Sequence, residues 1–130
     1  MGQPIATKTG ICFAFPDVLK TPTPGGPVPM PYPNIAQLSA ADPVADNVTA
    51  GGKPVVHEGS EISSSTGGEP GSGGGVKAPK HLGACTFKGF SGTVKVNGKK
   101  VVRQGDTTEQ NGGNATGSVM VGLPTVLVGG

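Results

Sequence analysis

The chain has 130 residues, of which 24 are glycine and 13 are proline, while aromatic residues make up only 4%. Its formal net charge of +2 and charged fraction of 14% exclude the clustered Lys and Arg of a nucleic-acid-binding protein and the high net charge of a typical disordered chain. These limits favour one turn-rich, all-β domain over residues 1–130, whose small core needs support from oligomerisation, a metal or a partner.

The first segment, residues 1–20, carries a short apolar run, "GICFAFPDV", which is closed by Pro16. No run at this end has the length of a secretory signal peptide, and no stretch of the chain is long enough to span a membrane. We therefore expect synthesis in the cytoplasm, followed by export along a route that needs no signal peptide.

Three segments differ from ordinary strands in their composition. Residues 21–34, "TPTPGGPVPMPYPN", are so rich in proline that a helix or a central strand is excluded and extended, polyproline-like backbone is favoured. Residues 34–47 hold the only helical candidate, which Pro43 limits to one or two turns. Residues 63–77, "SSSTGGEPGSGGGVK", have the composition of a flexible loop.

An internal repeat is the clearest pattern in the chain. Residues 48–59, "VTAGGKPVVHEG", match residues 94–105, "VKVNGKKVVRQG", and each copy holds a two-residue turn, Gly-Gly or Asn-Gly. Such dipeptides tolerate the positive φ angles of a type I′ turn, so each copy predicts a β-hairpin. A repeated hairpin indicates a pseudosymmetric fold built from similar faces.

The turns also predict the register of the two hairpins. Val48 is expected opposite Val55 in the first hairpin, and Val96 opposite Lys99 in the second. Because side chains alternate along a strand, His57 shares the face of Val55 and is expected to point inward or toward a covered edge.

Two later segments are also expected to be β structure. Residues 84–96, "ACTFKGFSGTVKV", predict a strand, a glycine-containing turn and the strand that enters the second hairpin. Residues 119–130, "VMVGLPTVLVGG", are apolar and β-prone, and Pro124 is expected to break them.

The soft or borderline metal ligands of the chain are two cysteines and two histidines, namely Cys12, His57, His81 and Cys85. They match the Cys₂His₂ set of a structural zinc site, and the pair His81-x₃-Cys85 has a plausible spacing for a turn. One zinc ion would tie three remote segments of a poorly packed chain together. Two alternatives stay open: the cysteines are small buried hydrophobic residues, or they pair as a disulfide.

Catalytic patterns are absent from the sequence. It has no G-x-S-x-G motif and no P-loop, and the serines near His57 fall in the glycine-rich segment rather than in a positioned triad. We therefore expect no enzymatic activity.

Two phrases carry a resemblance to a known family. Residues 12–34, "CFAFPDVLKTPTPGGPVPMPYPN", and residues 96–106, "VNGKKVVRQGD", resemble the PAAR-like proteins of the DUF4150 type. The second phrase is similar to the "G-K-P-A-A-R-x-G-D" core of PAAR proteins, and the first repeat copy is a degenerate version with His57 at the Arg position.

The resemblance implies a small cone of short strands and hairpins with pseudo-threefold faces, long Pro/Gly-rich loops and little helix. Such proteins cap the trimeric, VgrG-like β-helical spike of type VI secretion and other contractile injection systems, with one tip per trimer, and sharpen it for piercing a target membrane. The implied partners are this spike, separate effector cargo and, transiently, the target membrane. The tip is assembled on the injection apparatus and delivered outside the cell or into a target cell.

The resemblance also bears on the metal and on the docking surface. It implies a structural zinc ion near the apex, usually held by three His and one Cys, where this chain offers two of each. The apolar segment 119–130 suits either the surface that meets the spike or internal packing. The alternative function is a free-standing, zinc-stabilised β module that binds a protein or surface ligand outside any injection machine.

Overall fold

The computed structural model describes residues 2–128, without the side chains of Asp46 and Pro124. Its regular elements are strands and two single turns of 3₁₀ helix, so the all-β prediction is confirmed. The strands are β1 (Gln3–Ile5), β2 (Ile11–Thr21), β3 (Val28–Gln37), β4 (Ala41–Asp42), β5 (Ala45–Ala50), β6 (Lys53–Val55), β7 (Glu61–Ile62), β8 (Cys85–Phe87), β9 (Lys95–Val96), β10 (Lys99–Lys100), β11 (Thr107–Gln110), β12 (Ala115–Val119) and β13 (Leu123–Val128), and the 3₁₀ turns are η1 (Leu38–Ala40) and η2 (Asn111–Gly113).

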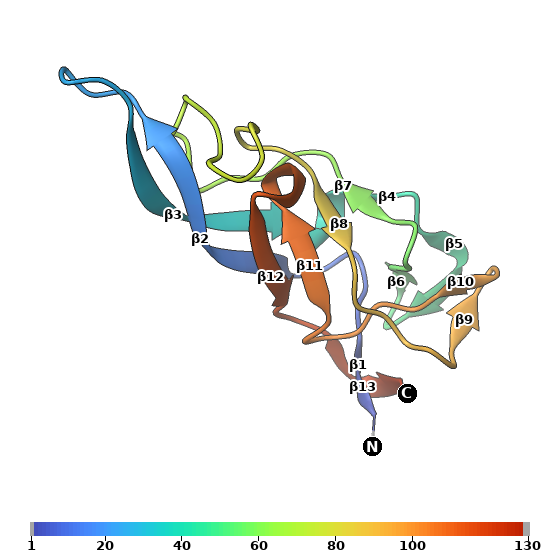
Figure 1. Cartoon of the computed structure of the whole chain (residues 1–130). Coiled ribbons are helices and arrows are strands. Elements are labelled where there is room, and N and C mark those ends of the chain that lie inside the picture. Colours follow the sequence, from blue (N-terminus) through green and yellow to red (C-terminus); the bar gives the residue numbers. More distant parts are fainter. Residues whose placement is uncertain (1, 129–130) are drawn as a thin grey trace.

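The strands form one large sheet and three small ones. The large sheet is antiparallel and has the order β3-β2-β12-β11-β8-β7-β4, while β1 with β13, β5 with β6 and β9 with β10 make three two-stranded sheets. The long β2–β3 hairpin extends to one end of the molecule, and the three small sheets lie away from its tip (Figure 1). In the described part of the chain, neither helical turn has the length or hydrophobicity needed to cross a membrane.

The proline-rich segment is partly a strand, and it occupies the edge of the large sheet. β3 pairs along most of its length with β2, including Pro29 opposite Lys20 and Pro31 opposite Val18. The prolines stand at alternate positions, 29, 31 and 33, so the missing N–H groups all fall on the same side of the strand. The exclusion of a helix and of a central strand is therefore confirmed, and the extended backbone forms an edge strand because the prolines face the free edge and leave the paired edge intact.

The glycine-rich segment is packed, contrary to the prediction of a flexible loop. Lys20 N donates to Gly74 O (2.8 Å), Gly73 N donates to Lys20 O (2.8 Å) and Val76 N donates to Val18 O (3.1 Å). The segment thus continues the sheet along the part of β2 that β12 does not reach. A Cβ at Gly71 would overlap Leu19, which is fully buried, so glycine here serves close packing and not flexibility.

A buried polar network joins the same region to η2. The Asp17 carboxylate is 1% exposed and accepts hydrogen bonds from the side-chain amides of Asn34 (3.2 Å), Asn111 (3.2 Å) and Asn114. Gln110 donates to Asn34 Oδ1 at 2.8 Å and so extends the network into β11. Every donor and acceptor has a specific partner, which holds the β2–β3 hairpin in one orientation on the sheet.

The predicted hairpins are present, with one difference in register. Val96 pairs with Lys99 in the second hairpin, as predicted. In the first hairpin the residue opposite Val55 is Ala45 and not Val48, because a bulge between Ala45 and Thr49 shifts the pairing.

Two other expectations are corrected in detail. The helical candidate at 34–47 forms only η1, because most of its residues extend β3, β4 and β5. In the C-terminal segment the break between strands falls at residues 120–122, and β13 continues through position 124.

Candidate functional site

Three short segments from remote parts of the chain form a closed ring of backbone hydrogen bonds. Ala6 N donates to Val102 O (2.9 Å), Val102 N donates to Val56 O (3.1 Å), and Val56 N donates back to Ala6 O (3.1 Å). Each segment therefore contacts both of the others, and equivalent atoms make each bond. We call this arrangement the strand ring, made of residues 4–8, 54–58 and 100–104.

A second set of bonds runs round the same ring. In each case a backbone N–H at the end of one segment meets the carbonyl at the start of another, and the isolated bridges follow the same cyclic order. The bonds are Lys8 N to Pro54 O (3.2 Å), Glu58 N to Lys100 O (2.8 Å) and Gln104 N to Pro4 O (2.8 Å), and the bridges are Thr7–Val55, His57–Val101 and Arg103–Ile5. The ring thus has approximate threefold symmetry, which confirms the prediction of pseudo-threefold faces.

The strand ring separates two clusters of buried side chains. Ala6, Val56 and Val102 are all 0% exposed and pack into the cluster beneath the large sheet. The preceding residue of each segment points the opposite way, because side chains alternate along a strand. These residues, Ile5, Val55 and Val101, belong to the second cluster, between the ring and the three small sheets.

The sequence contains a third, more divergent copy of the repeat, which the sequence pattern alone did not reveal. Residues 2–7, "GQPIAT", occupy the place of residues 52–57, "GKPVVH", and residues 98–103, "GKKVVR". The identity is low, since only Gly2 and Pro4 match the first copy and only Gly2 matches the second. The Gly-x-Pro spacing before two apolar residues is the signal that could have found it.

Each ring segment is joined to one two-stranded sheet. The β5–β6 and β9–β10 hairpins close through Gly51-Gly52 and Asn97-Gly98, whose positive φ angles of 59°, 79°, 51° and 78° suit the predicted turns. The third sheet pairs β1 with β13 side by side (Figure 1), so two separate strands replace the hairpin of the other two sheets. The equivalent pairs are Val128 with Gln3, Ala50 with Lys53 and Val96 with Lys99.

The segments leave the ring through similar turns. Arg103 N donates to Asp106 Oδ2 (2.7 Å), and His57 N donates to Ser60 Oγ (3.2 Å) at the equivalent place. Arg103 also forms an ion pair with Asp106, with 2.9 Å between Nη2 and Oδ1, and these hydrogen bonds raise the pKa of its guanidinium. The R-x-G-D phrase is thus a turn in which the carboxylate caps the strand, and Ser60 replaces that carboxylate in the first copy.

The structure brings together only the cysteine half of the predicted zinc set. Cys12 on β2 and Cys85 on β8 are both 0% exposed and belong to the same apolar cluster as free thiols. Hydrogen bonding with the Cys85 thiol, together with burial, raises the pKa of the Cys12 thiol, so this thiol keeps its proton. In this form the pair behaves as buried hydrophobic residues.

The two histidines lie elsewhere. His57 is 6% exposed, as predicted from its phase, and its Nδ1 accepts a hydrogen bond from Gly59 N (3.1 Å). His81 is exposed, and its Nε2 faces the carbonyl oxygens of Gly68 (3.0 Å) and Glu69 (3.1 Å).

These positions decide how the predicted ligands fit zinc. Within residues 2–128, no three His, Cys, Asp or Glu side chains form a metal-binding group. The four predicted ligands therefore do not fit one tetrahedral site in this arrangement. The zinc ion stays a prediction.

Comparison with known proteins gives one match. A family model described as "Toxin PAAR-like domain" matches residues 10–117. No curated protein and no solved structure matches the chain. The matched range contains the β2–β3 hairpin, the polar network and two of the three ring segments.

Proposed function

The chain belongs to the toxin PAAR-like domain family, and we propose that it caps the blunt end of a trimeric, VgrG-like β-helical spike, with one copy on each trimer. A PAAR-like domain is characteristic of a spike-associated protein. The proposed role is structural and non-enzymatic: the cap sharpens a contractile injection machine, such as a type VI secretion system, and leaves the cell with it.

The observation that carries this proposal is the strand ring. A trimer with threefold symmetry presents three identical surfaces around its axis. A single chain can contact all three only if it offers three similar surfaces of its own. The cyclic hydrogen bonds through Ala6, Val56 and Val102 give this chain that geometry.

The three two-stranded sheets are the surface that we propose for docking. They radiate from the ring and include exposed apolar side chains on β13, where Leu127 is 61% and Val126 is 37% exposed. Near the turns, Lys53 and Lys99 stand at equivalent positions in two of the sheets, and Gln3 takes that position in the third. Exposed apolar residues on a strand are typical of a surface that a partner covers.

Co-purification with a trimeric, VgrG-like β-helical spike protein tests the proposal. We expect a complex of one chain with three spike subunits by native mass spectrometry. Leu127→Asp should weaken the complex, whereas Val76→Asp, on the side of the β2–β3 hairpin, should not. A chain that binds no such spike would support the free-standing binding module instead.

A further inference from the structure

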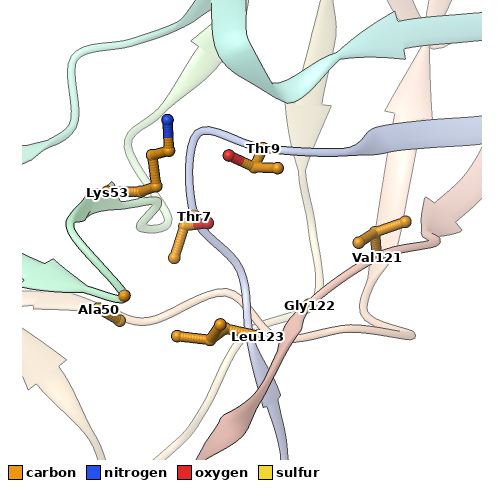
Figure 2. A pocket seen from close by; sticks show the side chains of 8 residues that line it. Thr7, Thr9, Ala50, Lys53, Val121, Gly122 and Leu123 are labelled. Carbon is orange, nitrogen blue, oxygen red and sulfur yellow. The ribbon is translucent and has the colours of Figure 1, made fainter.

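A pocket lies at one of the three junctions between segments of the strand ring, where the segment of residues 4–8 meets the segment of residues 54–58. It has a volume of about 200 Å³ and lies between the segment after β1, the β5–β6 turn and the start of β13. Thr7, Thr9 and Lys53 contribute its polar groups, and Ala50, Val121 and Leu123 contribute apolar walls (Figure 2).

The pseudo-threefold symmetry explains why the pocket is open at this junction. Thr7 occupies the ring position that His57 and Arg103 occupy in the other two segments. A threonine side chain is much smaller than an imidazole or a guanidinium group, so it fills less of its junction. Thr7 is therefore a specific difference between otherwise similar faces.

Two polar groups of the pocket have no partner among the described residues. Thr7 is 5% exposed, yet its hydroxyl makes no hydrogen bond within the described residues. Lys53 likewise forms no ion pair with any side chain in that range. No buried side-chain oxygen or nitrogen of the described residues lacks a hydrogen-bond partner, so the Thr7 hydroxyl is open to the pocket. Together with the ammonium of the exposed Lys53, it offers donors that suit an acceptor with negative charge.

We propose that this pocket binds a carboxylate on a short aliphatic stem, supplied by an acidic side chain at the blunt end of the trimeric spike. The stem packs on Val121 and Leu123, while the carboxylate accepts hydrogen bonds from the Lys53 ammonium and the threonine hydroxyls. The volume suits one side chain and falls below the roughly 300–1,000 Å³ of pockets that enclose free small molecules. The choice of ligand source rests on the proposed function, because Lys53 stands beside a turn of the proposed docking surface.

The chemistry of the pocket can be tested without a spike. Sodium butyrate is titrated into the ¹⁵N-labelled chain, with butyramide as the neutral probe of similar shape, and amide shifts are followed by NMR. Butyrate should shift the amides of Thr7, Lys53 and Leu123, and Lys53→Gln should weaken this binding about tenfold or more, as the loss of a charge-assisted hydrogen bond implies. Thr7→Val should weaken it without changing the fold, whereas Lys20→Gln, a matched change on the β2–β3 hairpin, should leave it unchanged.

Equal shifts from butyramide, or butyrate binding that is unaffected by Lys53→Gln, would overturn the carboxylate assignment. The spike is then a separate arm of the test. If wild-type chain binds the spike and Lys53→Gln binds it equally well, the acidic side chain is not the ligand. If wild-type chain binds no spike, the proposed function fails, and the butyrate titration still decides whether the pocket takes a carboxylate.

Discussion

The packing of buried side chains at the axis of the strand ring gives a quantitative prediction. Ala6 and Val56 occupy equivalent positions, are both 0% exposed and face the same buried cluster. Val56→Ala removes two methyl-sized groups, so it should cost about 2–3 kcal/mol of unfolding free energy from lost burial and the resulting cavity. Ala6→Val overfills the same space and should cost about 1–3 kcal/mol.

The double variant distinguishes a shared core from two independent sites. Ala6→Val with Val56→Ala conserves the total side-chain volume, so its cost should fall below the sum of the single costs by about 1 kcal/mol or more. Urea unfolding followed by circular dichroism measures this, since the chain has no tryptophan. The control double variant combines Ala6→Val with Val76→Ala, at a residue that is 52% exposed, and the unfolding free energies that these two changes cost should be additive. Additivity of the Ala6 and Val56 changes within about 0.5 kcal/mol would refute a common core at the ring axis.

Four further predictions follow from individual contacts. Gly71→Ala should destabilise the fold because its Cβ would overlap a buried leucine, whereas Gly25→Ala, which meets nothing within 4 Å, should be neutral in thermal unfolding. Asp17→Ala should cost about 3 kcal/mol or more in urea unfolding, because three buried side-chain amides lose their acceptor, and a cost near zero would contradict the network. Burial and a neighbouring lysine lower the pKa of His57 below its usual 6.5. The contribution of His57 to stability is therefore complete above pH 6.5 and is lost as the pH falls toward the lower pKa of the folded state. His57→Gln should reduce this loss of stability in thermal melts recorded across the same pH range. Elemental analysis tests the zinc prediction. One zinc ion per chain that is lost in Cys85→Ser would support the prediction and would require the histidines to move to the cysteines. A folded protein without zinc would reject the prediction.

Sequence patterns predicted the parts of the site that depend on neighbours along the chain. The Gly-Gly and Asn-Gly turns, the buried phase of His57 and the pairing of Val96 with Lys99 all depend on local backbone chemistry and on alternation along a strand. The register of the first hairpin was not predicted correctly. Its bulge leaves the turn unchanged but moves Ala45 into the place expected for Val48, which no local rule reveals.

The spatial arrangement of the predicted metal ligands is a second feature that sequence patterns left undetermined. A count of ligands identifies which side chains could bind zinc, but their distances depend on how remote strands are arranged. In the folded chain Cys12 and Cys85 meet inside the apolar cluster, while His81 lies on an exposed loop against the carbonyls of Gly68 and Glu69. Composition misled over the glycine-rich segment, because small residues serve close packing as readily as flexibility.

The sequence by itself thus determined an all-β chain with two similar hairpins and a family resemblance in its proline-rich and Arg-Gln-Gly-Asp phrases. Only the tertiary structure showed that residues 2–7 supply the third segment, that the hydrogen bonds close into a ring, and that a pocket lies at the junction that Thr7 occupies. The reason is physical: turn type and strand phase are set by adjacent residues, whereas ring closure and the shape of a pocket depend on contacts between segments far apart in the chain.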